Sequence, residues 1–290
     1  MLVQIGRMNE RIDSLTQQMN QLTAAIADRQ QADAQAYVTG QGVSKVNEGE
    51  REVTGLEIDG KQEASDALGE DTGAESGDLT ESTRRVYLTF DDGPSCYTED
   101  ILDILDRYDV KATFFVVGKE NDTAKELVRE IADRGHTLGM HSYSHVYSDI
   151  YGSEEQFEAD LNKIREYVYN AAGVTCTLYR FPGGSSNSVS RIDMEVFARC
   201  LDKQGIRFFD WNATSGDAVA DMPSVDQIVK NVMSDMEGYS TVVVLMHDAA
   251  DKRTTVEALP IIIESILALE DTAILPITED TEPVQHIRKK

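Results

Sequence analysis

The stretch VYLTFDDGPSCYTED, residues 86–100, sets a strand-like run directly against a pair of acids. Its first five residues are apolar or β-branched, which is typical of a buried strand, and the run ends at Asp91 and Asp92 before a Gly-Pro turn. Two adjacent carboxylates repel each other, and burying either one is costly unless something compensates its charge. We therefore expect either water at the mouth of a barrel or cleft, or a bound cation, at the end of this strand.

The pattern after Arg85 indicates an α/β fold, because short β-rich runs alternate with helical ones. The strand-like runs are VYLTF, KATFFVVG, HTLGMHS, CTLYRFPG, IRFFDWN, STVVVLMHD and TAILPIT. Helical segments between them include TAKELVREIADRGH, SEEQFEADLNKIREYVYNAAG and VEALPIIIESILALED. This pattern predicts a parallel sheet, either open or closed into a barrel, with the functional site at the carboxyl ends of the strands.

The overall charge argues against a nucleic-acid partner. The 290 residues include 27 basic and 52 acidic side chains, for a net charge of −25, whereas phosphate binding needs clustered Lys and Arg. No apolar run reaches the roughly 18 residues that a membrane span requires.

The three cysteines, Cys96, Cys176 and Cys200, form no metal-type CxxC pair. At most one disulfide could form, and the sequence leaves open whether Cys176 and Cys200 pair. Cys96 is expected to be a semi-buried small side chain.

The first 84 residues carry two further patterns. Apolar residues recur at alternating spacings of three and four, at Ile5, Met8, Ile12, Leu15, Met19, Leu22 and Ile26. This predicts a coiled-coil-like helix over 1–28 that self-associates or binds a partner helix through residues 5–26, with a lone amphipathic helix as the alternative. Residues 29–84 predict a flexible acidic linker, because the part from 46 to 81 has twelve acidic and two basic side chains and few large apolar ones. The folded domain is expected over 85–290.

Several predicted strands end in chemically apt side chains. They are Asp91 and Asp92 at the first, His141 and His145 at the third, Arg180 at the fourth, Asp210, Trp211 and Asp217 after the fifth, and His247 at the sixth. His141 and His145, at i and i+4 on a helical or turn-like segment, point to one side and suit a single metal. Two histidines and one carboxylate leave open coordination positions, as a catalytic ion requires. The other two histidines, His136 and His286, are assigned no site role.

The motifs TFDDGP, HSYSH, RFPGG, DWNATSGD and LMH resemble, in order and spacing, the five motifs of the polysaccharide deacetylase family, carbohydrate esterase family 4. The resemblance spans Arg85 to about Glu282 and includes bacterial peptidoglycan N-acetylglucosamine deacetylases. It implies a distorted (β/α)7 barrel and the metal-dependent removal of acetyl groups from a polysaccharide. The N-terminal helix and the linker lie outside it.

The resemblance implies a role for each matching residue. Asp92, His141 and His145 would hold one divalent metal ion, usually zinc in this family, with cobalt, nickel and manganese as alternatives. Asp91 would be the general base that takes a proton from a metal-activated water. His247 would be the general acid that protonates the leaving amine.

Five further residues are implied to support the reaction. Asp217 would raise the pKa of the general acid, and Arg180 would orient the acidic side of the site. The backbone N–H of Gly183 would stabilise the oxyanion, while Trp211 and Leu245 would line the pocket for the acetyl methyl group. Many family members have an aromatic residue at the position of Gly183, so a wall of the sugar subsite is either missing here or supplied from elsewhere.

The function expected from the sequence is therefore a metal-dependent polysaccharide N-deacetylase acting on peptidoglycan. Chitin oligomers and acetylated xylan are alternative substrates, and a small-molecule amidohydrolase or a non-catalytic carbohydrate-binding scaffold are alternative functions. We expect an extracytoplasmic, wall-facing protein that is membrane-anchored in a longer native chain, because a coiled coil and a solvated spacer would project the domain towards the wall. The net charge of −16 on residues 85–290 gives no long-range attraction to an anionic polymer.

Overall fold

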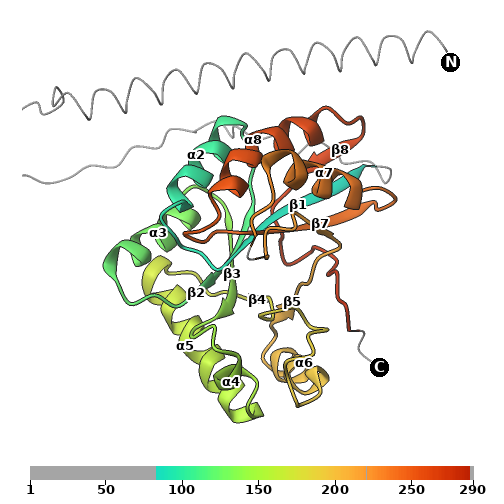
Figure 1. Cartoon of the computed structure of the whole chain (residues 1–290). Helices are drawn as coiled ribbons and strands as arrows, with labels where there is room; N and C mark the ends of the chain where they lie inside the picture. Colours follow the sequence, from blue (N-terminus) through green and yellow to red (C-terminus); the bar gives the residue numbers. More distant parts are fainter. Residues whose placement is uncertain (1–82, 220, 288–290) are drawn as a thin grey trace, which may run out of the picture. The chain divides into compact units, whose positions relative to one another are not determined.

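The central element of the fold is strand β1 (Arg84–Asp91), which contains the VYLTF run (Figure 1). The computed structural model describes residues 83–219 and 221–287, so the predicted helix over 1–28 and nearly all of the predicted linker lie outside the described residues. From Val86 to Asp91 every residue of β1 is buried, as expected of a strand covered on both faces. Strand β7 (Thr241–His247) pairs with β1 in parallel along one edge.

The other edge of β1 is shared by two strands. Strand β2 (Thr113–Val117) pairs with its carboxyl-terminal half, and β8 (Thr272–Ile274) pairs with its amino-terminal half. The whole sheet runs in the order β5-β4-β3-β2-β1-β7-β6, with every described pairing parallel. The remaining strands are β3 (Thr137–Ser142), β4 (Leu178–Tyr179), β5 (Arg207–Phe208) and β6 (Ala213–Thr214). The predicted parallel sheet is confirmed, and β6 is a two-residue strand that the sequence pattern did not predict.

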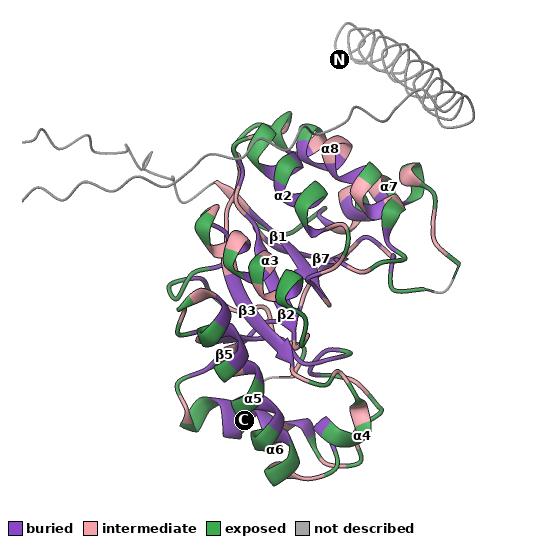
Figure 2. Cartoon of the chain, turned by 90° about the vertical axis from the view of Figure 1, so that its left-hand side faces the viewer, coloured by how far each residue is buried: buried purple, intermediate pink, exposed green. Residues whose placement is uncertain are grey.

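Helices cover the sheet and expose their outer faces, while the strands are buried (Figure 2). They are α2 (Thr98–Arg107), α3 (Asp122–Asp133), α4 (Tyr147–Ile150), α5 (Glu154–Ala172), α6 (Met194–Lys203), α7 (Val225–Asp235) and α8 (Arg253–Leu267). Helix α5 shows how local chemistry sets the ends. The side chain of Ser153 accepts a hydrogen bond from the Gln156 N–H at the start, and Gly173 at φ 70° stops the helix.

The segment after β8 ties the sheet together on its way to the C-terminus. Ile277 is fully buried; its N–H donates to the Thr113 hydroxyl (2.9 Å) and its carbonyl accepts from the Thr137 hydroxyl (2.8 Å). Further along, the Val284 carbonyl accepts from the N–H of Asp210 (2.8 Å), at the end of the β5 strand run. One segment therefore links the starts of β2 and β3 with the end of β5.

The cysteines differ in part from expectation. Cys96 is exposed, so the prediction of a semi-buried side chain was wrong: the loop after β1 is held inward through Ser95, which donates to Asp248, while the next residue faces solvent. Cys176 and Cys200 are buried and free, and the Cys176 thiol donates to the Leu138 carbonyl. None of the described helices is both long and apolar enough to cross a membrane.

We predict that Ile277→Ala destabilises the full-length chain by about 2–5 kcal/mol, because it deletes a buried side chain and leaves a cavity that the two bonded strands prevent from collapsing. Urea denaturation followed by circular dichroism measures the change. Leu267→Ala is the matched control, since that side chain is 48% exposed and its removal should cost far less. Equal losses in the two variants would show that the C-terminal segment contributes no core packing.

Candidate active site

The pairing of β1 with β7 brings two of the predicted catalytic side chains together. Asp91 and His247 are register partners at the carboxyl ends of these strands, so their side chains leave the sheet on the same side. Asp91 is 2% exposed, whereas the His247 side chain is 14% exposed and reachable from solvent. Leu245 lies two residues before His247 and therefore on the same face of β7.

Asp92, His141 and His145 form a cluster beside this pair. The Asp92 Oδ1 atom lies 3.1 Å from His145 Nε2 and 3.6 Å from His141 Nε2, and one ligand atom from each residue falls within 4.8 Å of the others. Oδ1 is buried and has no hydrogen-bond partner among the residues that the structure describes. A buried, unpaired carboxylate oxygen facing two imidazole nitrogens fits a divalent cation such as zinc.

A turn rather than a helix brings the two histidines together. His141 lies in β3, while His145 follows it with a φ of 51°, a left-handed conformation that non-glycine residues rarely adopt. Asp92 shares this property with a φ of 70°. Two of the three cluster residues are thus held in a conformation that costs of the order of 1–3 kcal/mol each, which the surrounding hydrogen bonds must offset.

Asp160, on α5, supplies those hydrogen bonds for the HSYSH turn. This buried carboxylate accepts from the Ser142 hydroxyl (2.8 Å), the Tyr143 N–H (2.9 Å) and the Ser144 N–H (2.9 Å). Ser142 in turn accepts from the N–H of His145 (2.9 Å). Sequence reasoning missed Asp160, because it lies in a helical segment rich in acids and only tertiary packing distinguishes it from its neighbours.

Asp248 holds the loop that follows Asp92 in place through hydrogen bonds, as Asp160 holds the HSYSH turn. Its N–H donates to the Asp91 carbonyl (2.8 Å), and its carboxylate accepts from the hydroxyls of Ser95 and Thr98. A Cβ atom on Gly93 would lie 2.5 Å from Asp248 Oδ2, so only glycine fits at this point of the loop. Burial raises the pKa of Asp248, although these hydrogen bonds oppose the effect.

The orientation of His141 exposes a single nitrogen to the cluster. Its Nδ1 lies 2.8 Å from the Arg180 carbonyl, which can only accept, so Nδ1 carries the proton and Nε2 keeps its lone pair. Burial lowers the pKa of His141 in spite of the nearby Asp91 and Asp92 charges. The ring is therefore neutral near pH 7 and ready to act as a ligand through Nε2.

Arg180 is fully buried and joins three strands at their carboxyl ends. Its guanidinium donates to Asp91 Oδ1 (2.8 Å), to the Thr89 hydroxyl (2.7 Å) and to the carbonyls of Phe209 and Asp210. One oxygen of the Asp91 carboxylate is thus committed to the guanidinium. The other, Oδ2, lies 3.8 Å from His141 Nε2 and is free to act towards the cluster.

His247 and Asp217 form a second buried pair. The Nδ1–H of His247 donates to Asp217 Oδ1 (2.7 Å), and the other carboxylate oxygen accepts from the His247 N–H (3.0 Å) and the Thr255 hydroxyl (2.8 Å). Burial by itself would lower the pKa of His247, but the hydrogen bond and charge of Asp217, helped by Asp91 and Asp92, outweigh burial and raise it. The pKa of Asp217 is lowered, because its hydrogen bonds and the His247 charge outweigh its own burial.

The PGG segment carries Gly183 and packs against Trp211. Gly183 is exposed at a φ of 76°, and its N–H has no acceptor among the described residues. A Cβ on the next residue, Gly184, would lie 2.9 Å from the Trp211 ring, so the indole packs directly on the PGG segment. Gly183 borders Tyr147, which packs on His145, and Leu245 shares a face of β7 with His247. The contacts of Gly183, Trp211 and Leu245 with a substrate remain predictions.

The two histidines that were assigned no site role, His136 and His286, lie in different environments. His136 is a core residue whose pKa burial lowers to about 4, and its Nδ1 accepts from the Ala112 N–H. His286 lies against Trp211, with ring centroids 5.1 Å apart, and its Nε2 donates to the Trp211 carbonyl (2.7 Å). The Asp210 carboxylate holds this end of the chain by accepting from the His286 N–H (2.8 Å) and from Ser185. Asp210 thus has a structural role, and His286 holds Trp211 in place by packing on its ring and donating to its carbonyl.

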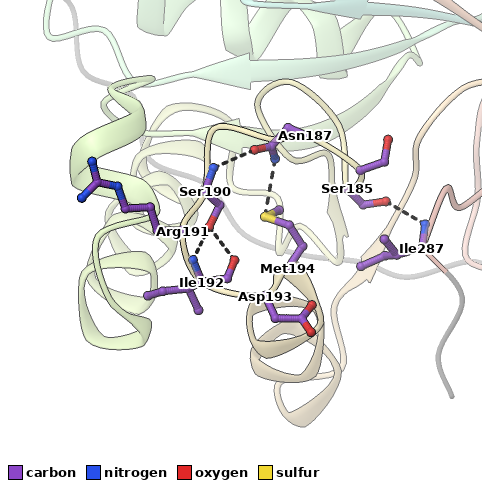
Figure 3. A pocket seen from close by; sticks show the side chains of 9 residues that line it. Ser185, Asn187, Ser190, Arg191, Ile192, Asp193, Met194 and Ile287 are labelled. Atoms are coloured by element: carbon purple, nitrogen blue, oxygen red, sulfur yellow. Dashed lines mark hydrogen bonds between the residues drawn. The ribbon is translucent and has the colours of Figure 1, made fainter.

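Two pockets adjoin the motif loops. One, of about 430 Å³, is lined by residues of the loop 185–194 and by Ile287, and Asn187 holds this loop in shape by accepting from the Ser190 N–H (3.2 Å) (Figure 3). The other, of about 360 Å³, lies beside the loop after Asp92 and includes Cys96 and Lys119. The first is rich in hydroxyl and amide groups and begins two residues after Gly183.

Residues 78–196 match the sequence profile of the polysaccharide deacetylase family. A putative polysaccharide deacetylase of Bacillus subtilis is 32% identical over 206 residues, which cover 68% of this chain and 70% of that protein. The crystal structure of the catalytic domain of a peptidoglycan N-acetylglucosamine deacetylase from Eubacterium rectale is 38% identical, with a TM-score of 0.68, and the match covers 73% of this chain and 96% of that one. The chain therefore belongs to the polysaccharide deacetylase family, a family of hydrolases.

The structural match also confirms the predicted distorted (β/α)7 barrel class. Membership alone does not guarantee turnover, because a further similar structure is described as a pseudoenzyme of carbohydrate esterase family 4. That protein is 26% identical, with a TM-score of 0.57, and the match covers 68% of this chain and 67% of that one. The role of each side chain in this protein therefore has to be argued from its own site.

We predict that Asp217→Asn lowers the pKa of His247 in the metal-free protein, because it removes the charge and the strong acceptor that raise it. A histidine-ring NMR titration measures the pKa, with the signal assigned through His247→Gln. Thr255→Val is the control, since it removes a hydrogen bond to Asp217 without touching the imidazole. An unchanged His247 pKa in Asp217→Asn would refute the pairing.

The same pair predicts how stability depends on pH. The raised His247 pKa adds stability that is complete below its unfolded value of about 6.5 and is lost as the pH rises through the folded value. The lowered Asp217 pKa adds stability above its unfolded value of about 3.9, which is lost as the pH falls through the folded value. The stability gap between wild type and Asp217→Asn should thus be wider at pH 5.5 than at pH 9 in urea denaturation. A gap that widens from pH 5.5 to 9 would contradict this account.

Proposed function

We propose that this protein is a metal-dependent polysaccharide N-deacetylase that hydrolyses the acetamido groups of peptidoglycan. The observation that carries the proposal is the buried, unpaired Asp92 Oδ1 facing the Nε2 atoms of His141 and His145, with a second carboxylate, Asp91, left free beside it. Such an arrangement suits one carboxylate as a metal ligand and its neighbour as a base. Family membership supports the same assignment.

Asp92, His141 and His145 would hold the ion, with zinc as the leading candidate because two imidazoles and one carboxylate are typical ligands of a catalytic zinc site. When bound, the ion supplies Lewis-acid chemistry, which polarises the acetyl carbonyl and makes water more acidic. The charge of a bound ion would also offset the repulsion between Asp91 and Asp92. Cobalt, nickel and manganese have compatible ligand preferences and stay alternatives.

In this proposal Asp91 and His247 transfer the protons, and the Gly183 N–H contributes a hydrogen bond. Asp91, oriented by Arg180 through one oxygen, takes a proton from the attacking water with the other. The Gly183 N–H donates to the oxygen on which negative charge develops. His247, whose pKa is raised by its hydrogen bond to Asp217, delivers a proton to the leaving nitrogen as the C–N bond breaks. The products are acetate and a free amine on the sugar.

Peptidoglycan is the proposed polymer because the similar Eubacterium rectale structure is described as a peptidoglycan N-acetylglucosamine deacetylase. We propose further that the protein works outside the cytoplasm near the cell wall, and that residues 5–26 associate with a partner helix or a second copy. Chitin oligomers and acetylated xylan remain as substrates to be tested in parallel. A bifunctional xylanase/deacetylase that is 32% identical, over a match covering 67% of this chain and 30% of that protein, gives a reason to include xylan.

We predict that the full-length chain releases acetate from N-acetylglucosamine oligomers or from purified peptidoglycan, that chelation abolishes this release, and that added zinc restores it. Asp91→Asn should lower kcat/KM by about 10²–10⁴-fold, because a positioned general base contributes that much. Asp122→Asn is the control, since this exposed carboxylate at the start of α3 should leave the rate unchanged. Acetate is measured by an enzyme-coupled assay.

Three outcomes would contradict this proposal. Release from acetylated xylan alone would reject peptidoglycan as the substrate. Release by Asp91→Asn at the wild-type rate would reject the base assignment. No release from any polymer, with one zinc ion bound per chain, would favour the non-catalytic scaffold.

We also predict that Asp92→Asn weakens zinc binding by more than about 100-fold, since losing even an outer partner of a metal ligand typically costs 10–100-fold. His141→Ala should behave similarly. Asp91→Asn is the matched carboxylate-to-amide control and should weaken zinc binding much less than Asp92→Asn, because Asp91 contributes a nearby charge but no ligand atom. Isothermal titration against a competing chelator distinguishes the two neighbours. Equal losses at Asp91 and Asp92 would overturn the division of labour between them.

A further inference from the structure

The aromatic group that the family motif leads one to expect at Gly183 is replaced by one from another element. A Cβ atom on Gly183 would lie 2.8 Å from the hydroxyl oxygen of Tyr147, which is the first residue of the short helix α4. The hydroxyl of Tyr147, which comes from α4, therefore occupies the space in which a side chain at position 183 would begin. Tyr147 is only two residues beyond His145 and thus belongs to the loop that carries the proposed metal ligands.

Two packing contacts fix where the Tyr147 ring lies. It meets the His145 ring edge to face, with centroids 6.0 Å apart, and the Tyr151 ring in the same manner at 5.8 Å. Tyr151 is buried, and its hydroxyl donates to the Pro182 carbonyl (2.9 Å), the residue just before Gly183. Helix α4 and the PGG segment are therefore locked together. The position of the Tyr147 hydroxyl follows from this packing and does not depend on an exposed, freely rotating side chain.

The Tyr147 hydroxyl also lacks a protein partner. It makes no hydrogen bond with any of the residues described between 83 and 287, although the side chain is half-buried and the comparable hydroxyl of Tyr151 is paired. Its neighbour, the Gly183 N–H, is likewise without an acceptor among those residues. A hydroxyl and an N–H that are both unpaired, on two segments that meet beside His145, suit a ligand oxygen that carries negative charge.

We propose that the Tyr147 hydroxyl is a second donor to the acetyl oxygen, acting together with the Gly183 N–H as negative charge develops there. The inference rests on the proposed deacetylase function and deepens it by assigning a catalytic residue outside the five motifs. It also accounts for glycine at position 183, since any larger residue would displace the phenol. Tyrosine suits this role because its hydroxyl is a donor held on a rigid ring.

The test is Tyr147→Phe in the full-length, zinc-loaded protein, with acetate release followed on N-acetylglucosamine oligomers. Because removing one donor of an oxyanion site costs about 10²–10³-fold in kcat, we expect a loss at the lower end of that range with KM nearly unchanged. Tyr169→Phe is the matched control, since that side chain is 56% exposed on α5 and should keep the full rate.

A second measurement separates catalysis from binding and from folding. In an Asp91→Asn background, which halts turnover, the Kd for the oligomer should be the same with Tyr147 or Phe at this position. Zinc affinity and the midpoint of urea unfolding should be unchanged as well. This combination supports a contact made only in the transition state, because a merely structural role would alter zinc affinity or unfolding.

The outcomes are distinguishable. A wild type that releases no acetate overturns the proposed function and this inference with it. An active wild type whose Tyr147→Phe variant keeps its kcat overturns the inference alone. A variant that loses only affinity, with kcat intact, makes Tyr147 a ground-state sugar contact and also overturns it, as does a loss of activity that follows a loss of zinc.

Discussion

The buried ion pair between Arg180 and Asp91 organises the carboxyl ends of the strands. Two charges removed from water are costly to bury, and the pair is tolerable only because the remaining donors of the guanidinium reach Thr89 and two backbone carbonyls. The arginine thereby ties together β1, β4 and the chain beyond β5. It also immobilises one oxygen of Asp91, which leaves the other with a single direction in which to act. The same contact thus holds the strand ends together and orients the carboxylate that we propose as the general base.

The loops that carry the site are held by carboxylates that do not take part in the proposed chemistry. Asp160 gathers three donors of the HSYSH turn, and Asp248 gathers the loop that follows Asp92. Both Asp92 and His145 are in left-handed backbone conformations that would relax without such support. Because rigid loops keep the three ligand atoms close together before any ion binds, less ordering remains to be done on binding. Each of these loops thus combines a proposed metal ligand with a carboxylate that fixes its turn.

Much of this could be predicted from the sequence, and the reasons are physical. Asp91 and His247 end β-rich runs, so the parallel-sheet rule brings them to one edge without knowledge of the packing. Asp160 could not be found in this way, because one acid among several on a helix is distinguished only by the turn that packs against it. Strand β6 has two residues, too few for a periodic pattern, and the tail that carries His286 shows no pattern for its contact with Trp211. Local signals identified the strand ends, whereas contacts between distant segments needed the structure.

The contact between Gly183 and Tyr147 is a further one that could not be predicted from the sequence, and it bears on the proposed function. The sequence motif shows that the aromatic side chain at position 183 is missing, but it does not point to Tyr147. That tyrosine is 36 residues away in the sequence, in a four-residue helix. The two positions are nevertheless coupled, since a Cβ at 183 and the phenol oxygen would lie only 2.8 Å apart. A side chain at 183 would force the Tyr147 hydroxyl to shift, and the Tyr147 ring packs on His145, a proposed metal ligand. Glycine at 183 therefore leaves room for the Tyr147 side chain of the neighbouring helix, which we propose as the substitute for the aromatic group of the family motif.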